Sequence, residues 1–235
     1  MRGNSGVLVS ARSGAGDGDP GAVVCSCAGR AGCGLPAPEA CACREKCRSR
    51  THSVDGGLDK AVTLITDEYR ALQAEMHRDP AYGVASIGYA PLVAKIIQQT
   101  ESHAILDYGA GKGRLHASLK RILSSWECEV FAYDPAIPEI SRAPSPCRFV
   151  VSIDVLEHIE PDCLDAVLDD LARVTFQWGF FTVHTGPAVK TLPDGRNAHL
   201  IQKPVWWWLP KLMERFDLLE FKRGANGFWV FVIRR

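Results

Sequence analysis

The chain has 235 residues, with 27 Lys plus Arg, 27 Asp plus Glu and 46% hydrophobic residues. This is the composition of a globular protein, and no apolar run approaches the roughly 18 residues that a membrane span needs. A formal net charge of zero lacks the basic excess that neutralises many phosphates. These features argue against a membrane protein or a standard secreted protein, and they disfavour a long nucleic acid as the partner.

Residues 1–57 differ in composition from the remainder. They hold 11 of the 21 glycines and six of the nine cysteines, yet contain no Phe, Trp or Tyr. Too little apolar surface is available there to offset the entropy of ordering a backbone. We therefore expect a disordered tail over 1–57 and one folded domain over 58–235. Zinc bound by the tail stays open as an alternative, although its C-x-C pairs are less typical of zinc than C-x2-C pairs.

The first two predicted elements are helices, which form a helical lid over 58–100. Apolar residues from Leu58 to Met76 recur at steps of three and four, which predicts a helix with one buried face. A second helix is expected from about Pro91. Tyr82, in the segment between them, is the predicted contact of this lid with a ligand.

Strand and helix patterns then alternate, which predicts a parallel α/β sheet. The expected strands span 103–108, 128–133, 148–153 and 176–184, and the expected helices span 113–124, 161–174 and 205–216. Two further apolar runs, 218–222 and 228–233, flank a glycine-containing turn and predict an antiparallel hairpin.

A glycine-rich turn follows the first strand. The segment from Ile105 to Gly113 reads ILDYGAGKG, with the spacing G-x-G-x-G and Asp107 two positions before the first glycine. Glycine there lets a ligand approach the backbone closely. The spacing differs from the G-x-G-x-x-G of dinucleotide-binding proteins, so a dehydrogenase is disfavoured.

Two further polar positions follow the next two strands. Asp134 ends the second strand, where a carboxylate can accept both hydroxyls of a ribose. The third strand leads into Asp154, Glu157 and His158. Because the carboxyl ends of parallel strands meet at one edge, we expect these three segments to form a single site.

These residues resemble the class I S-adenosylmethionine-dependent methyltransferases over roughly 60–235. The similar segments are LDYGAGKG, AYDPAI and SIDVLEHI. The resemblance implies a Rossmann-like, doubly wound sheet with a C-terminal antiparallel hairpin. Only 13 residues, Pro135 to Cys147, connect the second strand to the next one, too few for the usual helix and third strand. We therefore expect the third-strand crossover to be deleted.

The resemblance also implies the cofactor and its contacts. Asp107, Gly109 and Gly111 would line the methionine side of S-adenosylmethionine, together with Ala110. Asp134 would hold the ribose and Asp154 would lie near the sulfonium. The adenine contact cannot be carried over, and Ile137 is offered as a candidate.

Methyl transfer requires alignment of a nucleophile with the methyl group and, for some acceptors, removal of a proton. His158 and His199 are the catalytic candidates, because a neutral imidazole can accept a proton near pH 7. The leading hypothesis is a cytoplasmic methyltransferase acting on a small molecule, with no metal ligands assigned. Protein partners are not defined by the sequence.

Two alternatives stay open. Asp154, Glu157 and His158 are similar to the E-x-x-E-H motif of metal-dependent ubiquinone-pathway and small-RNA 3′-terminal O-methyltransferases, and His199 could add a ligand from a later loop. Magnesium would then assist 2′-O-methylation of an RNA end. The other alternative is an inactive module that binds the cofactor.

An aromatic run, Trp206 to Trp208, lies in the helix predicted at 205–216. Three consecutive side chains cannot share one helix face, so at least one ring should point away from the core. Core packing is the favoured interpretation, and a lid over a planar substrate is the alternative. The cysteines after residue 57 are expected to be small core residues in a reducing compartment, without disulfides.

Overall fold

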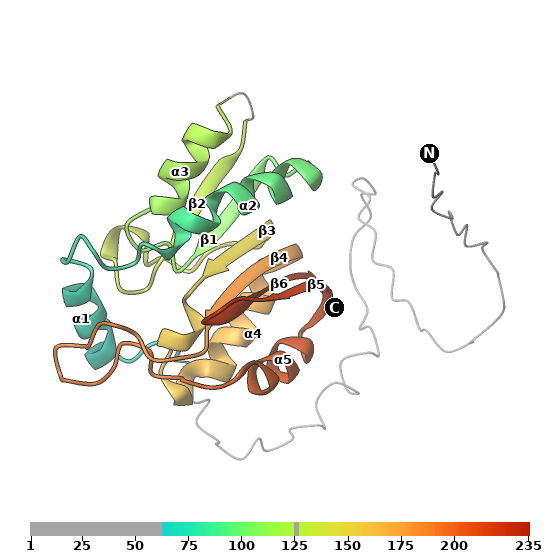
Figure 1. Cartoon of the computed structure of the whole chain (residues 1–235). Coiled ribbons are helices and arrows are strands. Elements are labelled where there is room, and N and C mark those ends of the chain that lie inside the picture. The colour runs from blue at the N-terminus through green and yellow to red at the C-terminus, as the bar shows by residue number, and fades with distance from the viewer. Residues whose placement is uncertain (1–62, 125–126) are drawn as a thin grey trace, which may run out of the picture. The chain divides into compact units, whose positions relative to one another are not determined.

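The computed structural model describes residues 63–124 and 127–235. The predictions for the tail, including the zinc alternative, and for residues 58–62 lie outside this range. A six-stranded sheet with the order β2-β1-β3-β4-β6-β5 organises the domain (Figure 1). The strands are β1 (Ala104–Tyr108), β2 (Glu129–Tyr133), β3 (Cys147–Ile153), β4 (Thr175–His184), β5 (Phe216–Arg223) and β6 (Gly227–Arg234).

The first four strands run parallel, and β6 lies antiparallel between β4 and β5. Five α-helices accompany them in the described residues: α1 (Asp67–Met76), α2 (Ala85–Gln99), α3 (Arg114–Ile122), α4 (Leu164–Val174) and α5 (Val205–Met213). The predicted α/β fold with a C-terminal antiparallel hairpin is therefore confirmed.

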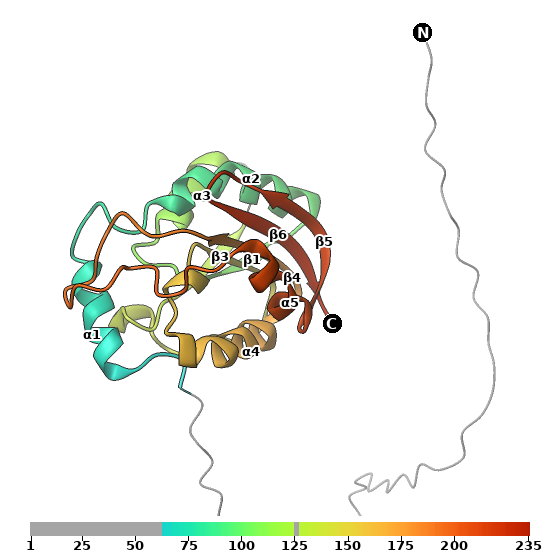
Figure 2. The same cartoon turned by 60° about the horizontal axis from the view of Figure 1, so that its bottom comes forward.

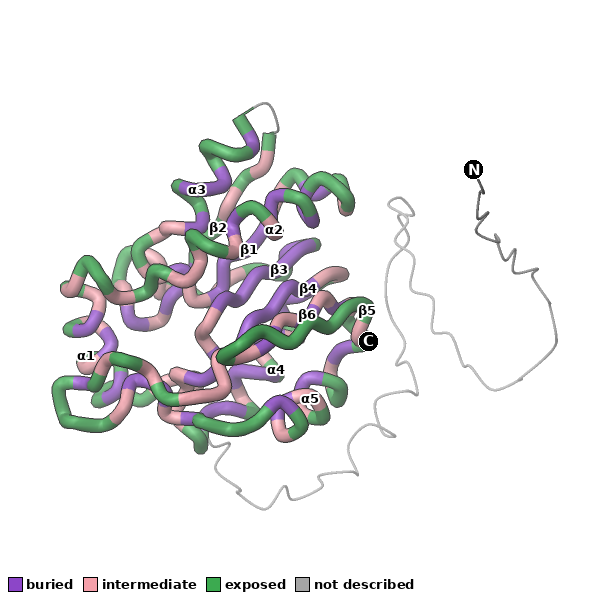
Figure 3. The backbone as a smooth tube through the Cα atoms, in the orientation of Figure 1, coloured by how far each residue is buried: buried purple, intermediate pink, exposed green. Residues whose placement is uncertain are grey.

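Helices cover both faces of the sheet, and each face has its own apolar core (Figure 2). Ile105, Phe149 and Phe180 face α2 and α3, whereas Leu106 and Val150 face α4 and α5. Successive strand residues alternate between these two cores because strand side chains have a period of two. The central strands β1, β3 and β4 are accordingly buried along most of their length, while β5 is largely exposed (Figure 3).

The first helix begins later than its apolar pattern predicted. It starts at Asp67, with Thr66 as the N-cap, and residues 63–66 are not helical. The Thr66 hydroxyl accepts the N–H of Tyr69 at 3.2 Å, and both the hydroxyl and the N–H of Thr66 donate to the carboxylate of Glu160. A favourable N-cap that also contacts a distant loop therefore determines where the helix starts.

The second helix begins at Ala85 rather than at about Pro91, so the predicted start is wrong by six residues. Pro91 lies inside the helix and removes one backbone hydrogen bond to Ile87. Both residues are exposed, so water can satisfy the freed carbonyl group. The last helix likewise contains Pro210 and ends at Met213, three residues before its predicted end.

The connection between β2 and β3 is short. Within it the structure contains one 3-10 helix, Pro138–Ile140, and β2 is an edge strand of the sheet. This is the connection in which the crossover was expected to be deleted, and it keeps the chain after β2 close to the carboxyl edge of β1.

The aromatic side chains of α5 point to different sides of the helix, as expected for three consecutive residues. Trp206 is 72% exposed, whereas Trp208 is fully buried and donates its indole N–H to the carbonyl of Lys203. Cys147 and Cys163 are buried, and Cys128 is partly buried. None of these cysteines forms a disulfide within the described range.

In residues 63–124 and 127–235, each helix is too short or too polar to cross a membrane.

Candidate active site

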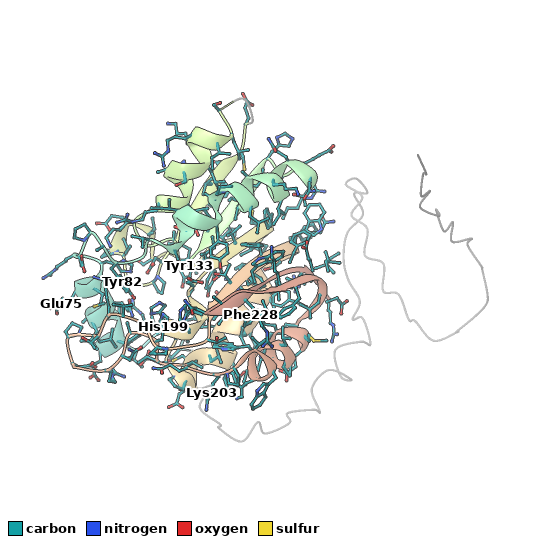
Figure 4. All side chains as sticks on the ribbon, viewed as in Figure 1. Glu75, Tyr82, Tyr133, His199, Lys203 and Phe228 are labelled. Atoms are coloured by element: carbon teal, nitrogen blue, oxygen red, sulfur yellow. The ribbon has the colours of Figure 1, made fainter. Side chains whose placement is uncertain are left out.

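A pocket of about 380 Å³ lies at the carboxyl ends of the parallel strands. The segments after β1, β2, β3 and β4 line it, and α1 with the following loop covers its outer side (Figure 4). Ligands of open α/β sheets bind at this edge. The lining includes seven residues predicted for the site: Gly109, Ala110, Gly111, Asp134, Asp154, His158 and His199.

The glycine-rich turn needs glycine for two physical reasons. Gly109, Gly111 and Gly113 have φ values of +84°, +51° and +66°, which side-chain-bearing residues rarely adopt. A Cβ atom on Gly109 would also lie 2.4 Å from Cγ2 of Val155. The backbone of this turn therefore forms the floor of the pocket where a side chain would not fit.

Asp134 connects the end of β2 to the glycine-rich turn. Its Oδ2 accepts the N–H of Gly111 at 3.0 Å, and its Oδ1 accepts the N–H of Ala136 at 3.0 Å. The side chain is buried but lines the pocket. Each carboxylate oxygen retains a further lone pair, so two ribose hydroxyls could still donate to this side chain.

Asp107 differs from the other predicted cofactor contacts because it does not line the pocket. It is 4% exposed, near the end of β1. Burial, with a smaller contribution from the nearby Asp134, raises the pKa of its carboxyl group to about 7. The assignment of Asp107 to the methionine side of the cofactor therefore stays a prediction.

Asp154 is fixed at the end of β3 by the neighbouring strand. Thr182 of β4 donates its hydroxyl to Asp154 Oδ1 and accepts the N–H of Asp154 at 2.9 Å. Asp154 has a φ of +50°, a conformation that is uncommon outside glycine. The two hydrogen bonds hold this strained residue at the pocket wall.

His158 and His199 both line the pocket, and the centroids of their rings lie 4.7 Å apart. Nδ1 of His158 lies 2.7 Å from the carbonyl oxygen of Ala198, and Nδ1 of His199 lies 2.7 Å from that of Gly186. A carbonyl oxygen only accepts, so both Nδ1 atoms carry the hydrogen. In the neutral rings each Nε2 consequently has a free lone pair.

Burial favours the neutral form of both imidazoles. Burial, with a smaller contribution from the adjacent His199, lowers the pKa of His158 to about 4. Burial also lowers the pKa of His199, against the opposing effect of its hydrogen bond to Gly186. Neutral rings with free Nε2 lone pairs can accept a proton or coordinate a cation.

Glu157 lies directly before His158 and is completely buried. Its Oε1 accepts the N–H of His184 at 2.9 Å, whereas its Oε2 has no hydrogen-bond partner among the described residues. Burial, with Asp154 nearby, raises the pKa of Glu157 well above its usual range.

The cover over the pocket is joined to its wall by hydrogen bonds. Tyr69 of α1 donates to the carbonyl of His158 at 2.5 Å and accepts from Gln73 at 2.6 Å. Tyr82 donates to Gln73 Oε1 at 2.9 Å and also lines the pocket. Tyr82 therefore lies where the sequence placed a lid contact.

Trp206, Trp207 and Trp208 do not line the pocket, so the structure does not support their interpretation as a lid.

His77 is a site residue that sequence analysis did not identify. It caps the end of α1, and its Nε2 lies 3.7 Å from Asp134 Oδ2. Burial lowers the pKa of His77, while the charge of Asp134 opposes this effect. No local pattern marks this histidine, because its proximity to Asp134 depends on how α1 folds back over the sheet.

A second pocket borders the other side of the glycine-rich turn. Ile137 lines it, together with Gly111, Lys112 and Ala136. The residue proposed from sequence to pack on an adenine ring is therefore close to the turn, although it lines a different pocket from the histidines.

No protein-family model and no curated protein matches this chain. Among solved structures, it is similar to the Burkholderia thailandensis 1,6-didemethyltoxoflavin-N1-methyltransferase, with 17% identity and a TM-score of 0.51. The match covers 71% of this chain and 89% of that enzyme, whose structure contains 1,6-didemethyltoxoflavin and S-adenosylhomocysteine.

A second similar structure is that of the mitomycin 7-O-methyltransferase MmcR, with 14% identity and a TM-score of 0.51. That match covers 70% of this chain and 60% of the mitomycin enzyme. Together with the strand order and the hairpin, these similarities show that residues 63–124 and 127–235 have the fold of class I S-adenosylmethionine-dependent methyltransferases.

Proposed function

We propose that this protein transfers the methyl group of S-adenosylmethionine to a small-molecule acceptor. One observation supports this most strongly: the glycine-rich turn and the carboxylate of Asp134 lie in direct hydrogen-bond contact at the carboxyl edge of the sheet. This pairs a close backbone approach with a ribose acceptor, which is the arrangement a nucleoside cofactor needs.

The size and lining of the pocket support a small acceptor. Its volume of about 380 Å³ lies in the range typical of small-molecule sites, roughly 300–1,000 Å³. The glycine-rich turn and Asp134 line one part, and His158 and His199 line another. We assign the first part to the cofactor and the second to the acceptor.

The reaction needs little from the protein beyond alignment, because the sulfonium already activates the methyl group. The oxygen or nitrogen of the acceptor would attack the methyl carbon, and the carbon–sulfur bond would break with its electron pair staying on sulfur. Asp154 would lie near the sulfonium. Closure by α1 would exclude water and hold the acceptor in line.

Calorimetric titration of the full chain with S-adenosylmethionine and with S-adenosylhomocysteine tests the cofactor assignment. Asp134→Ala should weaken the binding of both by at least about tenfold, because buried ribose hydroxyls would lose a charged acceptor. Glu139→Ala is the matched control. It removes an exposed carboxylate five positions away, outside both pockets, and should leave binding unchanged.

Folding of each variant is checked by thermal unfolding, because Asp134 also binds two backbone N–H groups. A folded wild-type chain that binds neither compound would refute the proposal. Binding followed by methyl transfer to no acceptor in a small-molecule panel would instead favour the cofactor-binding module.

A further inference from the structure

His77, at the C-terminal end of α1, lies where three segments of the pocket meet. Its Nε2 is 3.7 Å from Asp134 Oδ2 at the end of β2, and its Cε1 would lie 3.2 Å from a Cβ atom placed on Gly111. The ring of Tyr82, which is labelled in Figure 4, meets the imidazole edge to face, with the ring centroids 5.3 Å apart. One edge of the imidazole therefore faces the space between the glycine-rich turn and the proposed ribose acceptor.

The ring nitrogens of His77 are not engaged by the described residues. Nδ1 is buried and has no hydrogen-bond partner there, and the 3.7 Å from Nε2 to Asp134 is too long for a hydrogen bond. The other histidines of the pocket differ, because each places Nδ1 within 3.1 Å of a backbone carbonyl oxygen: His158, His184 and His199. An apolar side chain would fill this place without an unsatisfied nitrogen, so the imidazole indicates a polar group supplied by a ligand.

The protonation of His77 determines what it can offer to such a group. Burial lowers the pKa of His77, although the charge of Asp134 opposes this effect, so the neutral ring is favoured. A neutral imidazole carries one N–H and one lone pair. The hydrogen is favoured on Nε2, because this nitrogen is the one that faces the carboxylate. Nε2 therefore presents a donor to the space in front of Asp134 Oδ2.

One hydroxyl group fits between these two atoms. Hydrogen bonds to oxygen are roughly 2.7–3.0 Å long, so an oxygen bonded to both atoms spans the separation of 3.7 Å with little movement of either side chain. The hydroxyl would donate to Asp134 Oδ2 and accept from His77 Nε2. Asp134 Oδ2 already accepts the N–H of Gly111 at 3.0 Å, and its remaining lone pair suits this second donor.

We infer that His77 is a second contact for the ribose of the cofactor, and that one ribose hydroxyl connects it to Asp134. The inference rests on the proposed function and adds to it a residue that selects for a hydroxylated sugar. A nucleoside that lacks this hydroxyl would leave the N–H of His77 and an oxygen of Asp134 unpaired. Sites with buried polar groups reject such analogues strongly for this reason.

The same contact would hold the cover over the pocket closed. In Figure 2, α1 stands apart from the helices on the two faces of the sheet. Its buried residues Tyr69 and Met76 pack with Leu192 and Ala198 of the loop before α5, in a small cluster separate from both cores of the sheet. A ribose bound between His77 and Asp134 would connect the end of α1 to β2. Cofactor binding would therefore shift the cover toward its closed position.

Calorimetry with three ligands tests the hydroxyl contact: S-adenosylhomocysteine and its 2′-deoxy and 3′-deoxy forms. The loss of affinity on removal of each hydroxyl is measured in the full wild-type chain and in His77→Phe. Phenylalanine keeps a ring against Tyr82 but has no N–H. We expect the loss for one hydroxyl to be about fivefold smaller in His77→Phe than in the wild type, and the loss for the other hydroxyl to be unchanged.

Two further variants separate the hydrogen bond from packing. His77→Gln retains an N–H donor on a side chain of similar reach and should regain most of the wild-type discrimination. His116→Phe makes the same change as His77→Phe at an exposed histidine of α3 outside both pockets, and it should match the wild type. Thermal unfolding checks each variant, and His77→Leu takes the place of His77→Phe if the phenylalanine variant does not fold.

Hydrogen exchange over residues 67–76 tests the coupling to the cover. Saturating S-adenosylhomocysteine should slow exchange there by at least about tenfold in the wild type and by less in His77→Phe. Exchange over residues 164–174 of α4 is the internal reference and should respond equally in both proteins. Equal slowing over 67–76 in the two proteins overturns the coupling.

The outcomes distinguish this inference from the proposed function. A folded wild type that does not bind S-adenosylhomocysteine refutes the proposed function, and the ribose contact with it. Binding in which His77→Phe weakens all three ligands by the same factor, or by none, refutes the ribose contact of His77 alone, because a structural role would not depend on a single hydroxyl.

Discussion

The backbone N–H of Gly111 donates to the carboxylate of Asp134 at 3.0 Å, and this bond joins the first two strands of the sheet at their carboxyl ends. The glycine-rich turn is held to β2 by two further hydrogen bonds, from the N–H groups of Gly109 and Ala110 to the carbonyl of Tyr133. Asp134, the proposed ribose acceptor, and the glycine-rich turn, the floor of the pocket, are therefore held together. A substitution that disturbs either one should weaken cofactor binding.

Gly109→Ala tests this unit from the side of the turn. The new Cβ atom would lie 2.4 Å from Val155, and the residue would keep a φ of +84° only under strain. We expect a loss of about 1–3 kcal/mol in the free energy of unfolding and weaker binding of S-adenosylmethionine. Denaturant unfolding and calorimetry measure the two effects.

Gly88→Ala is the control for this substitution. Gly88 lies in α2, and a Cβ atom there would meet nothing within 4 Å. Alanine should stabilise the helix by up to about 1 kcal/mol and leave cofactor binding unchanged. If Gly109→Ala behaves like Gly88→Ala, the close fit of the turn is not required.

Tyr82→Phe should loosen the cover over the pocket. The substitution leaves Gln73 Oε1 without the hydroxyl that donates to it at 2.9 Å. We expect hydrogen exchange over residues 67–84 to accelerate about tenfold, because an unsatisfied buried acceptor favours local opening. Mass spectrometry of the exchanged peptides measures this.

The corresponding control is Tyr89→Phe in α2. Tyr89 packs against Phe180 at a ring-centroid distance of 6.1 Å and does not line the pocket. Exchange over 67–84 should match the wild type in this variant. Equal rates in Tyr82→Phe and the wild type would show that the hydroxyl does not hold α1 in place.

The arrangement of the sheet was predictable because it depends on local patterns. Apolar runs mark the strands, and glycine or aspartate directly follows each of the first three parallel strands. Parallel strands place these polar ends at one edge, so Gly109, Asp134 and Asp154 could be brought together from sequence alone. Their common pocket agrees with that prediction.

Features that depend on distant contacts were not predictable. The start of α1 reflects the hydrogen bonds of Thr66 to Glu160, which is 94 residues away. The position of His77 beside Asp134 depends on the path of α1 over the pocket. The unsatisfied oxygen of Glu157 depends on complete burial, and periodicity does not reveal which side of a short turn is enclosed.

Thr182→Val tests the anchor of Asp154. Valine has nearly the shape of threonine but cannot donate to Asp154 Oδ1 or accept its backbone N–H. We expect a loss of about 1–3 kcal/mol in the free energy of unfolding and weaker cofactor binding, because Asp154 loses its fixed position. Thr182→Ser retains the hydroxyl and should preserve binding. Equal cofactor affinity in the valine and serine variants would show that the position of Asp154 does not contribute to cofactor binding.

The buried carboxyl group of Asp107 should make stability depend on pH. Its pKa is raised to about 7 in the folded protein, from 3.8 for the exposed group, chiefly by burial. Between these values the folded protein retains a proton that the unfolded chain has released. The free energy of unfolding therefore falls as pH rises from about 4 to 7, by at most about 1.4 kcal/mol per pH unit for this one group.

Asp107→Asn removes this titration while keeping the size of the side chain. The variant should show a shallower fall in stability between pH 4 and 7, and it should exceed the wild type in stability above pH 7. Urea unfolding at half-unit pH steps measures both curves.

Glu157 also has a raised pKa, so it too lowers the free energy of unfolding as pH rises. The difference between the wild-type curve and the Asp107→Asn curve therefore isolates the contribution of Asp107. Asp162→Asn, an exposed carboxylate substitution, should follow the wild-type curve. Parallel curves for Asp107→Asn and the wild type would mean that Asp107 is ionised within the fold, and a cationic sulfonium would then have a charged partner near the end of β1.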